Sequence, residues 1–253
     1  MRSYLGWGPK AVLFSLVWAQ QGLQMGARLQ LARSSFLSQT ERTSPLLNRN
    51  PSYKAGLTGF FAWDWSPYWA TGLEIAYQSV GQSYYGLGVN GEAYQAEVRL
   101  HYLRMGLAFT GQYAQGIWGA FLTVSPSLAF LTQADQQYQG DSLQRSSLTN
   151  PQIIQNTLAY LSQSTDPDDR LVLMRMYRRW VPTISLSGGL RVRLAPQVWL
   201  LGLVGYERSL ADIENKGYQI RPELPPVYAP QRSHTYCQLL SLQVGLQYEV
   251  FFN

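Results

Sequence analysis

Histidine is the residue type that could signal catalysis here, and the chain has only two, His101 and His234. A Ser/His/Asp hydrolase needs an imidazole within hydrogen-bond reach of both a nucleophile and an orienting carboxylate. His234 directly follows Ser233, and successive side chains point to opposite faces of an extended segment. Two isolated histidines and one cysteine also give no metal-ligand pattern. The sequence therefore predicts no catalytic residue, no metal site and no cofactor.

The charged residues fall instead on the polar faces of alternating segments. His101 shares such a face with Glu97 and Arg99, at spacings of two and four residues. If those faces line the inside of a small barrel, charges of both signs can pair there as a hydrogen-bonded plug. We expect this cluster to be structural and to leave no open channel. The predicted lumen cluster comprises Arg28, Glu74, Glu97, Arg99, His101, Arg191, Arg193 and Glu249.

The elements that must position these charges are β-strands, because apolar and polar residues alternate with a period of two. The first clear case sets Leu29 and Leu31 against Arg28 and Gln30. Segments 53–64, 116–131 and 197–209 alternate less cleanly. The alternation predicts an all-β fold, an eight-stranded antiparallel up-and-down transmembrane β-barrel. Its strands are expected near residues 23–31, 53–64, 69–78, 94–102, 116–131, 180–194, 197–209 and 240–252.

The connections between these segments alternate in length. Short ones are expected at 64–67, 110–115 and 195–196, and long ones at 36–52, 79–92, 132–177 and 210–235. Bacterial outer-membrane barrels combine short periplasmic turns with longer extracellular loops. Aromatic residues follow the same division, which predicts a girdle at each membrane interface. The expected short-turn girdle is Trp63, Trp65, Trp69, Trp118 and Trp199, and the long-loop girdle is Tyr77, Tyr94, Trp180, Tyr206 and Tyr236.

The N-terminus has the pattern of an export signal. Basic residues precede the apolar run Ala11–Trp18, and Ala19 provides a small residue for cleavage. We expect a signal peptide over 1–19 and a barrel domain over 20–253, located in the cell outer membrane. Charged residues make up only 14% of the chain, against about 25% in an average globular domain. A net charge of +5 without a dense Lys/Arg cluster predicts no nucleic-acid partner.

Three segments resemble the PorT-like outer-membrane β-barrel family of Bacteroidetes. Residues 69–81 (WATGLEIAYQSVG) look like the family's third strand, and 100–107 (LHYLRMGL) are similar to its fourth, with Met105-Gly106 where Pro is usual. The C-terminal 243–250 (QVGLQYEV) is similar to the signal that barrel-assembly machinery recognises on a last strand. The resemblance implies fold and location, with a secretion accessory role as an expectation.

The interpretation that fits these patterns best is a non-enzymatic outer-membrane protein that acts through its surface loops. Its expected partners are outer-membrane lipid, the barrel-assembly machinery and an envelope or secretion-system protein. One alternative is a soluble periplasmic lipocalin-like carrier, whose apolar face would line the lumen; the positions that decide this are Leu29, Leu73, Leu100 and Leu242. Another is an outer-membrane lipid-modifying enzyme, which would require His101 or His234. The long loop at 132–177 could contain a short helix over 151–162.

Overall fold

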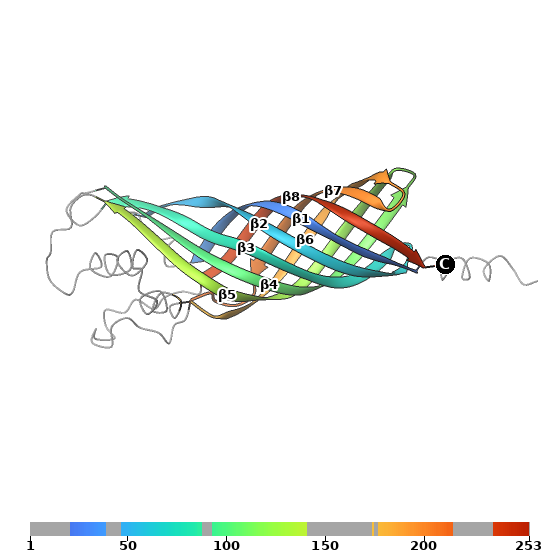
Figure 1. Ribbon diagram of the computed structural model, residues 1–253. Coiled ribbons are helices and arrows are strands. Elements are labelled where there is room, and N and C mark those ends of the chain that lie inside the picture. Colours follow the sequence, from blue (N-terminus) through green and yellow to red (C-terminus); the bar gives the residue numbers. More distant parts are fainter. Residues whose placement is uncertain are drawn as a thin grey trace, which may run out of the picture.

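The computed structural model of the chain is a closed barrel of eight antiparallel strands, each paired with its neighbour in sequence (Figure 1). It describes residues 21–38, 47–87, 93–140, 174, 177–214 and 235–252. The first and last strands close the barrel through a continuous register from Gln21↔Phe252 to Ser38↔Thr235. The strands are β1 (Gln21–Ser38), β2 (Leu47–Ser66), β3 (Trp69–Leu87), β4 (Ala93–Gln115), β5 (Trp118–Gly140), β6 (Trp180–Ala195), β7 (Val198–Ser209) and β8 (Thr235–Phe252).

Connection length alternates around the barrel, as predicted. Two-residue turns at 67–68, 116–117 and 196–197 join β2 to β3, β4 to β5 and β6 to β7. Gly116 in the second turn has φ 63°, a backbone conformation that side chains with a Cβ rarely adopt. The other connections are longer, and β4 runs further than expected, to Gln115. Figure 1 shows β3, β4 and β5 extending beyond β1, β6, β7 and β8, away from the end where the chain's C-terminus lies. The far side is called the long-loop end below.

Over most of the barrel height the outer face is apolar. Leu29, Leu73 and Leu242 are 70%, 57% and 64% exposed, so these three positions face outward as a membrane barrel requires. The exposed apolar side chains come from all eight strands, and they are called the apolar band below. The band comprises Met25, Leu29, Leu31, Leu57, Phe61, Leu73, Ile75, Leu103, Met105, Leu107, Phe109, Leu122, Val124, Leu128, Ile184, Leu186, Leu190, Leu200, Val204, Leu240, Leu242, Val244 and Leu246.

The long-loop end reverses this polarity. Its interior is an apolar cluster in which Leu100 is fully buried and Leu131 is 1% exposed. The prediction that Leu100 faces outward was therefore wrong. The other cluster members include Ala32, Phe36, Val80, Val98, Tyr102, Ala129, Ala134, Val181, Ile213, Cys237 and Leu239. Its outer face carries polar side chains that continue the outward positions of the apolar band: Arg33, Ser35, Ser79, Glu97, Arg99, His101, Gln133, Asp135, Arg208 and Gln238.

Aromatic side chains mark both edges of the band, although Trp199 departs from the expected arrangement, Tyr236 is half-buried, and the side chain of Tyr94 lies outside the described part of the chain. Trp63, Trp65, Trp69 and Trp118 are exposed beside the short turns, and Tyr77, Trp180 and Tyr206 are exposed toward the long-loop end. Trp199 was expected in the first group, but it is completely buried. On β7 the inward positions are Trp199, Leu201 and Leu203, which pack in the lumen with Phe60 and Phe121, because Leu200, Gly202 and Val204 occupy the outer face.

Several predicted features lie outside the described residues. These are the signal peptide over 1–19, residues 141–173 of the expected loop with its helix, and His234. The loop was expected to begin at residue 132, which was wrong, because β5 continues to Gly140. Within the described residues, no helix is both long and apolar enough to cross a membrane.

Candidate functional site

The lumen at the level of the apolar band holds a chain of buried charges. Arg28 pairs with Glu74, whose second oxygen lies 3.8 Å from Arg104 Nη2. Arg104 Nη1 lies 3.2 Å from Glu207 Oε2, and Gln78 donates a 2.7 Å hydrogen bond to the other oxygen of Glu207. Two guanidinium groups therefore face two carboxylates contributed by β1, β3, β4 and β7. Each charge has an opposite partner, which is the condition for burying ions at tolerable cost.

A second set of contacts lies closer to the short turns. Arg191 Nη1 is 2.7 Å from Glu249 Oε1, and Gln247 donates to the same oxygen at 2.8 Å. Asp64 accepts hydrogen bonds from Gln24 at 2.6 Å and Gln112 at 2.7 Å. These groups link β1, β2, β4, β6 and β8 across the lumen. The two sets together are called the lumen network.

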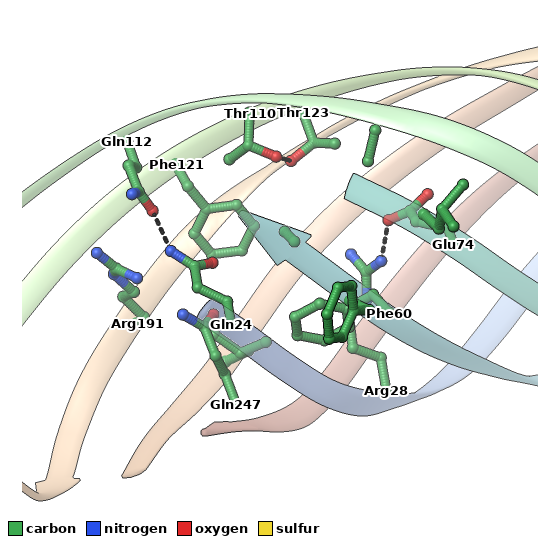
Figure 2. Close-up of a pocket in the computed structure, with 15 residues that line it drawn as sticks. Gln24, Arg28, Phe60, Glu74, Thr110, Gln112, Phe121, Thr123, Arg191 and Gln247 are labelled. Carbon is green, nitrogen blue, oxygen red and sulfur yellow. Dashed lines mark hydrogen bonds and ion pairs between the residues drawn. The ribbon is translucent and has the colours of Figure 1, made fainter. Parts of the chain in front are cut away.

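The space left inside the lumen network is small. Figure 2 shows Arg28 directed at Glu74 on one side of the cavity, and Gln24 bonded to Gln112 on the other. Phe60 and Phe121 also line the cavity, whose volume is about 40 Å³. A cavity that holds a water molecule needs roughly 10–15 Å³ by this measure, so this one is suited to water and not to a solute. The lumen network and the two phenylalanine rings therefore fill most of the lumen around this cavity.

Five of the predicted cluster residues lie on the lumen side of their strands. Arg28, Glu74, Arg191 and Glu249 belong to the lumen network. Arg193 is exposed at the short-turn mouth, where its guanidinium lies 4.5 Å from the Trp199 ring centroid. The network also contains groups outside the predicted cluster: Gln24, Asp64, Gln78, Arg104, Gln112, Glu207 and Gln247.

The remaining three predicted residues, Glu97, Arg99 and His101, were assigned to the wrong face. They share the outer face of β4 with Leu103, while Val98, Leu100 and Tyr102 are buried inside. The pairing of β3 with β4 is continuous from Trp69 to Leu87, so no bulge between these strands reverses the facing. The apolar residues of β4 change sides instead: they face inward up to Tyr102 and outward from Leu103.

These three residues belong to two polar clusters on the outer face at the long-loop end. In the first, Glu97 contacts Lys54 Nζ at 2.5 Å and Arg99 Nη2 at 2.7 Å. The hydrogen bond from Arg99, followed by that from Lys54, outweighs desolvation and lowers the pKa of Glu97 to about 2. Because these groups lie beyond the apolar band and partly in water, we expect the ion pairs to contribute little to folding stability.

The second outer cluster is built around His101. Ser79 Oγ lies 2.8 Å from His101 Nδ1, and Asp135 Oδ2 lies 3.4 Å from His101 Nε2. The Tyr77 ring stacks on the imidazole at 6.1 Å between centroids, with its hydroxyl 3.3 Å from Nδ1. The sequence reasoning missed Ser79 and Asp135, because they reach His101 from β3 and β5 and are far from it in sequence. This cluster is the only Ser/His/Asp arrangement within the described residues.

Comparison with known proteins finds only distant structural likenesses. No family model and no curated protein match the sequence. The chain is similar to the solved structure of OprG, an outer membrane protein from Pseudomonas aeruginosa, with a TM-score of 0.44, 10% identity, and coverage of 92% of this chain and 97% of that one. For Neisserial surface protein A the TM-score is 0.41 and the identity 9%, with 89% of this chain and 96% of that one covered. For the outer membrane protease OmpT from Escherichia coli the TM-score is 0.34 and the identity 9%, with 93% of this chain and 97% of that one covered. Likenesses this distant carry no argument about activity or ligand.

Proposed function

We propose that the chain is an integral protein of the outer membrane, with a plugged barrel that acts through its long-loop end. The observation that carries this proposal is the apolar band, which surrounds a closed barrel whose charges are turned inward. A lipocalin-like carrier needs the opposite arrangement, with a large apolar face lining an internal ligand site. Among the described residues the lumen has two apolar clusters, one at the long-loop end and one around Trp199, and both consist of packed side chains.

We propose further that the lumen network is structural and takes no part in transport or catalysis. An eight-stranded barrel has an interior just wide enough for side chains to fill it. Here paired ions and amides occupy it, and the remaining cavity of about 40 Å³ is too small for a permeating solute. The roles left for the molecule lie on its surface, at the long-loop end.

The role we propose for that end is contact with another envelope component. The resemblance to the PorT-like family suggests a secretion-system protein as the partner. Photo-crosslinking from Arg33, on the outer face of β1, followed by identification of the captured protein, tests this partner. Crosslinks to lipid alone would contradict an interaction role.

Cell fractionation with gel analysis tests the membrane proposal. We expect the protein in the outer-membrane fraction, with an unboiled band that migrates differently from the boiled one, because a closed barrel resists SDS until it is heated. Purified protein in planar bilayers should give no stable conductance steps. A soluble periplasmic protein without a heat shift would contradict the membrane placement, and regular conductance steps would contradict the plug.

A further inference from the structure

The cluster around His101 has the connectivity of a hydrolytic triad. A hydroxyl contacts one imidazole nitrogen at 2.8 Å, and a carboxylate lies 3.4 Å from the other. Asp135 is itself held by Gln133, whose amide donates to both of its oxygens at 3.0 and 2.8 Å. A carboxylate at Nε2 favours the tautomer that carries its proton there, which makes Nδ1 the acceptor. The Ser79 hydroxyl lies nearer to Nδ1, at 2.8 Å, than the Tyr77 hydroxyl, at 3.3 Å. Catalytic hydrogen bonds are often long before a substrate binds.

Strand register, with one bulge, builds this arrangement. Ser79 is the direct cross-strand partner of His101, and Asp135 pairs with Arg99, two residues before His101 on β4. The register between β4 and β5 shifts at Thr132, because His101 pairs with Gln133 while Tyr102 pairs with Leu131. Outward positions on β5 are even-numbered up to Phe130 and odd-numbered from Gln133. Without this extra residue, Asp135 would point into the lumen. Bulges are over-represented beside active sites, where they redirect side chains.

We propose that Ser79, His101 and Asp135 form a serine hydrolase site that cleaves acyl esters of membrane lipids. Ser79 is the nucleophile and His101 the general base and acid. Asp135 is a positioning residue that holds the imidazole and stabilises its protonated form. This proposal rests on the membrane placement proposed above, and it replaces the expectation of a non-enzymatic protein with a specific activity.

The position of the site at the edge of the apolar band selects the substrate class. Toward the band, the next outward residues are Tyr77 on β3 and Leu103 on β4, and on β5 Phe130 follows beyond Gln133. An acyl chain lying along the band would bring its ester group, which sits at the interface, level with Ser79. On the other side of His101, Arg99 keeps 37% of its side chain exposed and offers a cation to an anionic headgroup. Acyl esters occur in glycerophospholipids and in the lipid A of lipopolysaccharide, and the chemistry is the same for both.

The reaction balances with water as the only co-reactant. Ser79 Oγ attacks the ester carbonyl carbon as its proton passes to His101 Nδ1. The ester C–O bond then breaks, and His101 returns the proton to the leaving alkoxide, which departs as an alcohol. A water molecule attacks the acyl-serine, giving its proton to His101. Release of the fatty acid restores the Ser79 hydroxyl when His101 gives that proton back.

The test uses the full mature chain in two kinds of vesicle, phosphatidylethanolamine with phosphatidylglycerol, and the same lipids with lipopolysaccharide. We expect fatty acid release, lowered at least about 100-fold by Ser79→Ala and by His101→Gln. Asp135→Asn should lower kcat and leave KM unchanged. A fluorophosphonate should add covalently to the peptide that contains Ser79 in the wild type. The matched control is Ser83→Ala, on the same strand and face, which should retain both release and labelling.

The two arms separate the lipid sources. Release from the phospholipid vesicles identifies a glycerophospholipid ester, and release only with lipopolysaccharide identifies a lipid A ester. A heat-modifiable barrel that neither releases fatty acid nor labels at Ser79 would overturn the hydrolase and leave the membrane placement intact. Release and labelling that survive Ser79→Ala would also overturn it. A chain that never becomes heat-modifiable in either vesicle would contradict the membrane placement, and the hydrolase with it.

Discussion

In the band region and at the long-loop end of this barrel, apolar and charged side chains face in opposite directions. Around the band, leucines such as Leu242 face outward and the interior holds the ion pairs of the lumen network. At the long-loop end, Leu100 is buried inside while Glu97 and Arg99 pair on the outer face. The same strands serve both regions. The difference indicates two solvents along one barrel, with lipid around the band and water around the long-loop end.

The largest effect should come from unpairing the lumen network. Glu74→Gln removes the carboxylate between Arg28 and Arg104, both of them buried. Arg104 keeps its ion pair with Glu207, but Arg28 loses its counter-ion. Leaving this buried cation unpaired should cost about 3–5 kcal/mol of unfolding free energy, measured by urea unfolding in lipid vesicles. The same substitution in the other region, Glu97→Gln, should cost at most about 1 kcal/mol. Equal costs at the two sites would remove the distinction between the regions.

The next effect comes from the apolar interior of the long-loop end. Leu100→Ala opens a cavity among packed side chains and should cost about 2–5 kcal/mol. Leu103→Ala, three residues along β4 but on the outer face of the band, should cost clearly less because lipid chains refill the space. Unfolding curves of the two variants provide the comparison. A larger loss at Leu103 would contradict the assigned facing of β4.

A charge placed in the band should also discriminate between the regions. Leu242→Arg puts a cation on the lipid-facing surface, and we expect a cost of about 2–4 kcal/mol. Gln238→Arg lies on the same face of β8, four residues nearer the long-loop end, and should cost about 0–1 kcal/mol. Gln243→Arg tests the lumen side of the same strand. If Leu242→Arg were as mild as Gln238→Arg, the band would not be embedded in lipid.

The smallest effect is a pH dependence at the long-loop end. The pKa of Glu97 is lowered to about 2 from the ordinary value of 4.5. The stabilisation that its ion pairs give is therefore complete above about pH 4.5 and disappears as the pH falls through 2. The difference in unfolding free energy between wild type and Glu97→Gln should shrink between pH 5 and pH 2. A difference that does not change with pH would show that these ion pairs do not stabilise the fold.

Much of the fold is predictable because alternation and loop length are local signals. Leu29 and Leu31 against Arg28 and Gln30 identify a strand with two unlike faces, and the short turns settle the order of the strands. What alternation cannot give is the solvent on each face. On β4 the apolar residues change sides between Tyr102 and Leu103. The prediction turned the apolar residues of β4 toward lipid along the whole strand. It therefore placed Glu97, Arg99 and His101 inside the barrel, although they lie outside.

The sites depend on contacts between strands, which the sequence pattern does not specify. Arg104 lies just after Leu103, where the apolar residues of β4 begin to face outward. Because the prediction turned the even-numbered residues of β4 toward lipid, it did not place Arg104 in the lumen. Asp135 faces His101 only because of the bulge at Thr132, and nothing in the residue types there marks an insertion. Ser79 meets His101 only once the register of β3 against β4 is known. The predicted cluster thus contained four of the eleven residues of the lumen network, Arg28, Glu74, Arg191 and Glu249, and the contacts of the two outer clusters were not predicted.

Spin labels along the outer face of β4 test the central claim of two solvents most directly. Single cysteines at Met105, Leu103, His101 and Arg99, in a Cys237→Ser background, would carry the label in vesicles. Collision with oxygen, which partitions into lipid, and with a water-soluble nickel chelate would then be measured. We predict that oxygen dominates at Met105 and Leu103 and that the nickel chelate dominates at Arg99. Nickel access at all four positions would contradict a barrel embedded by its apolar band.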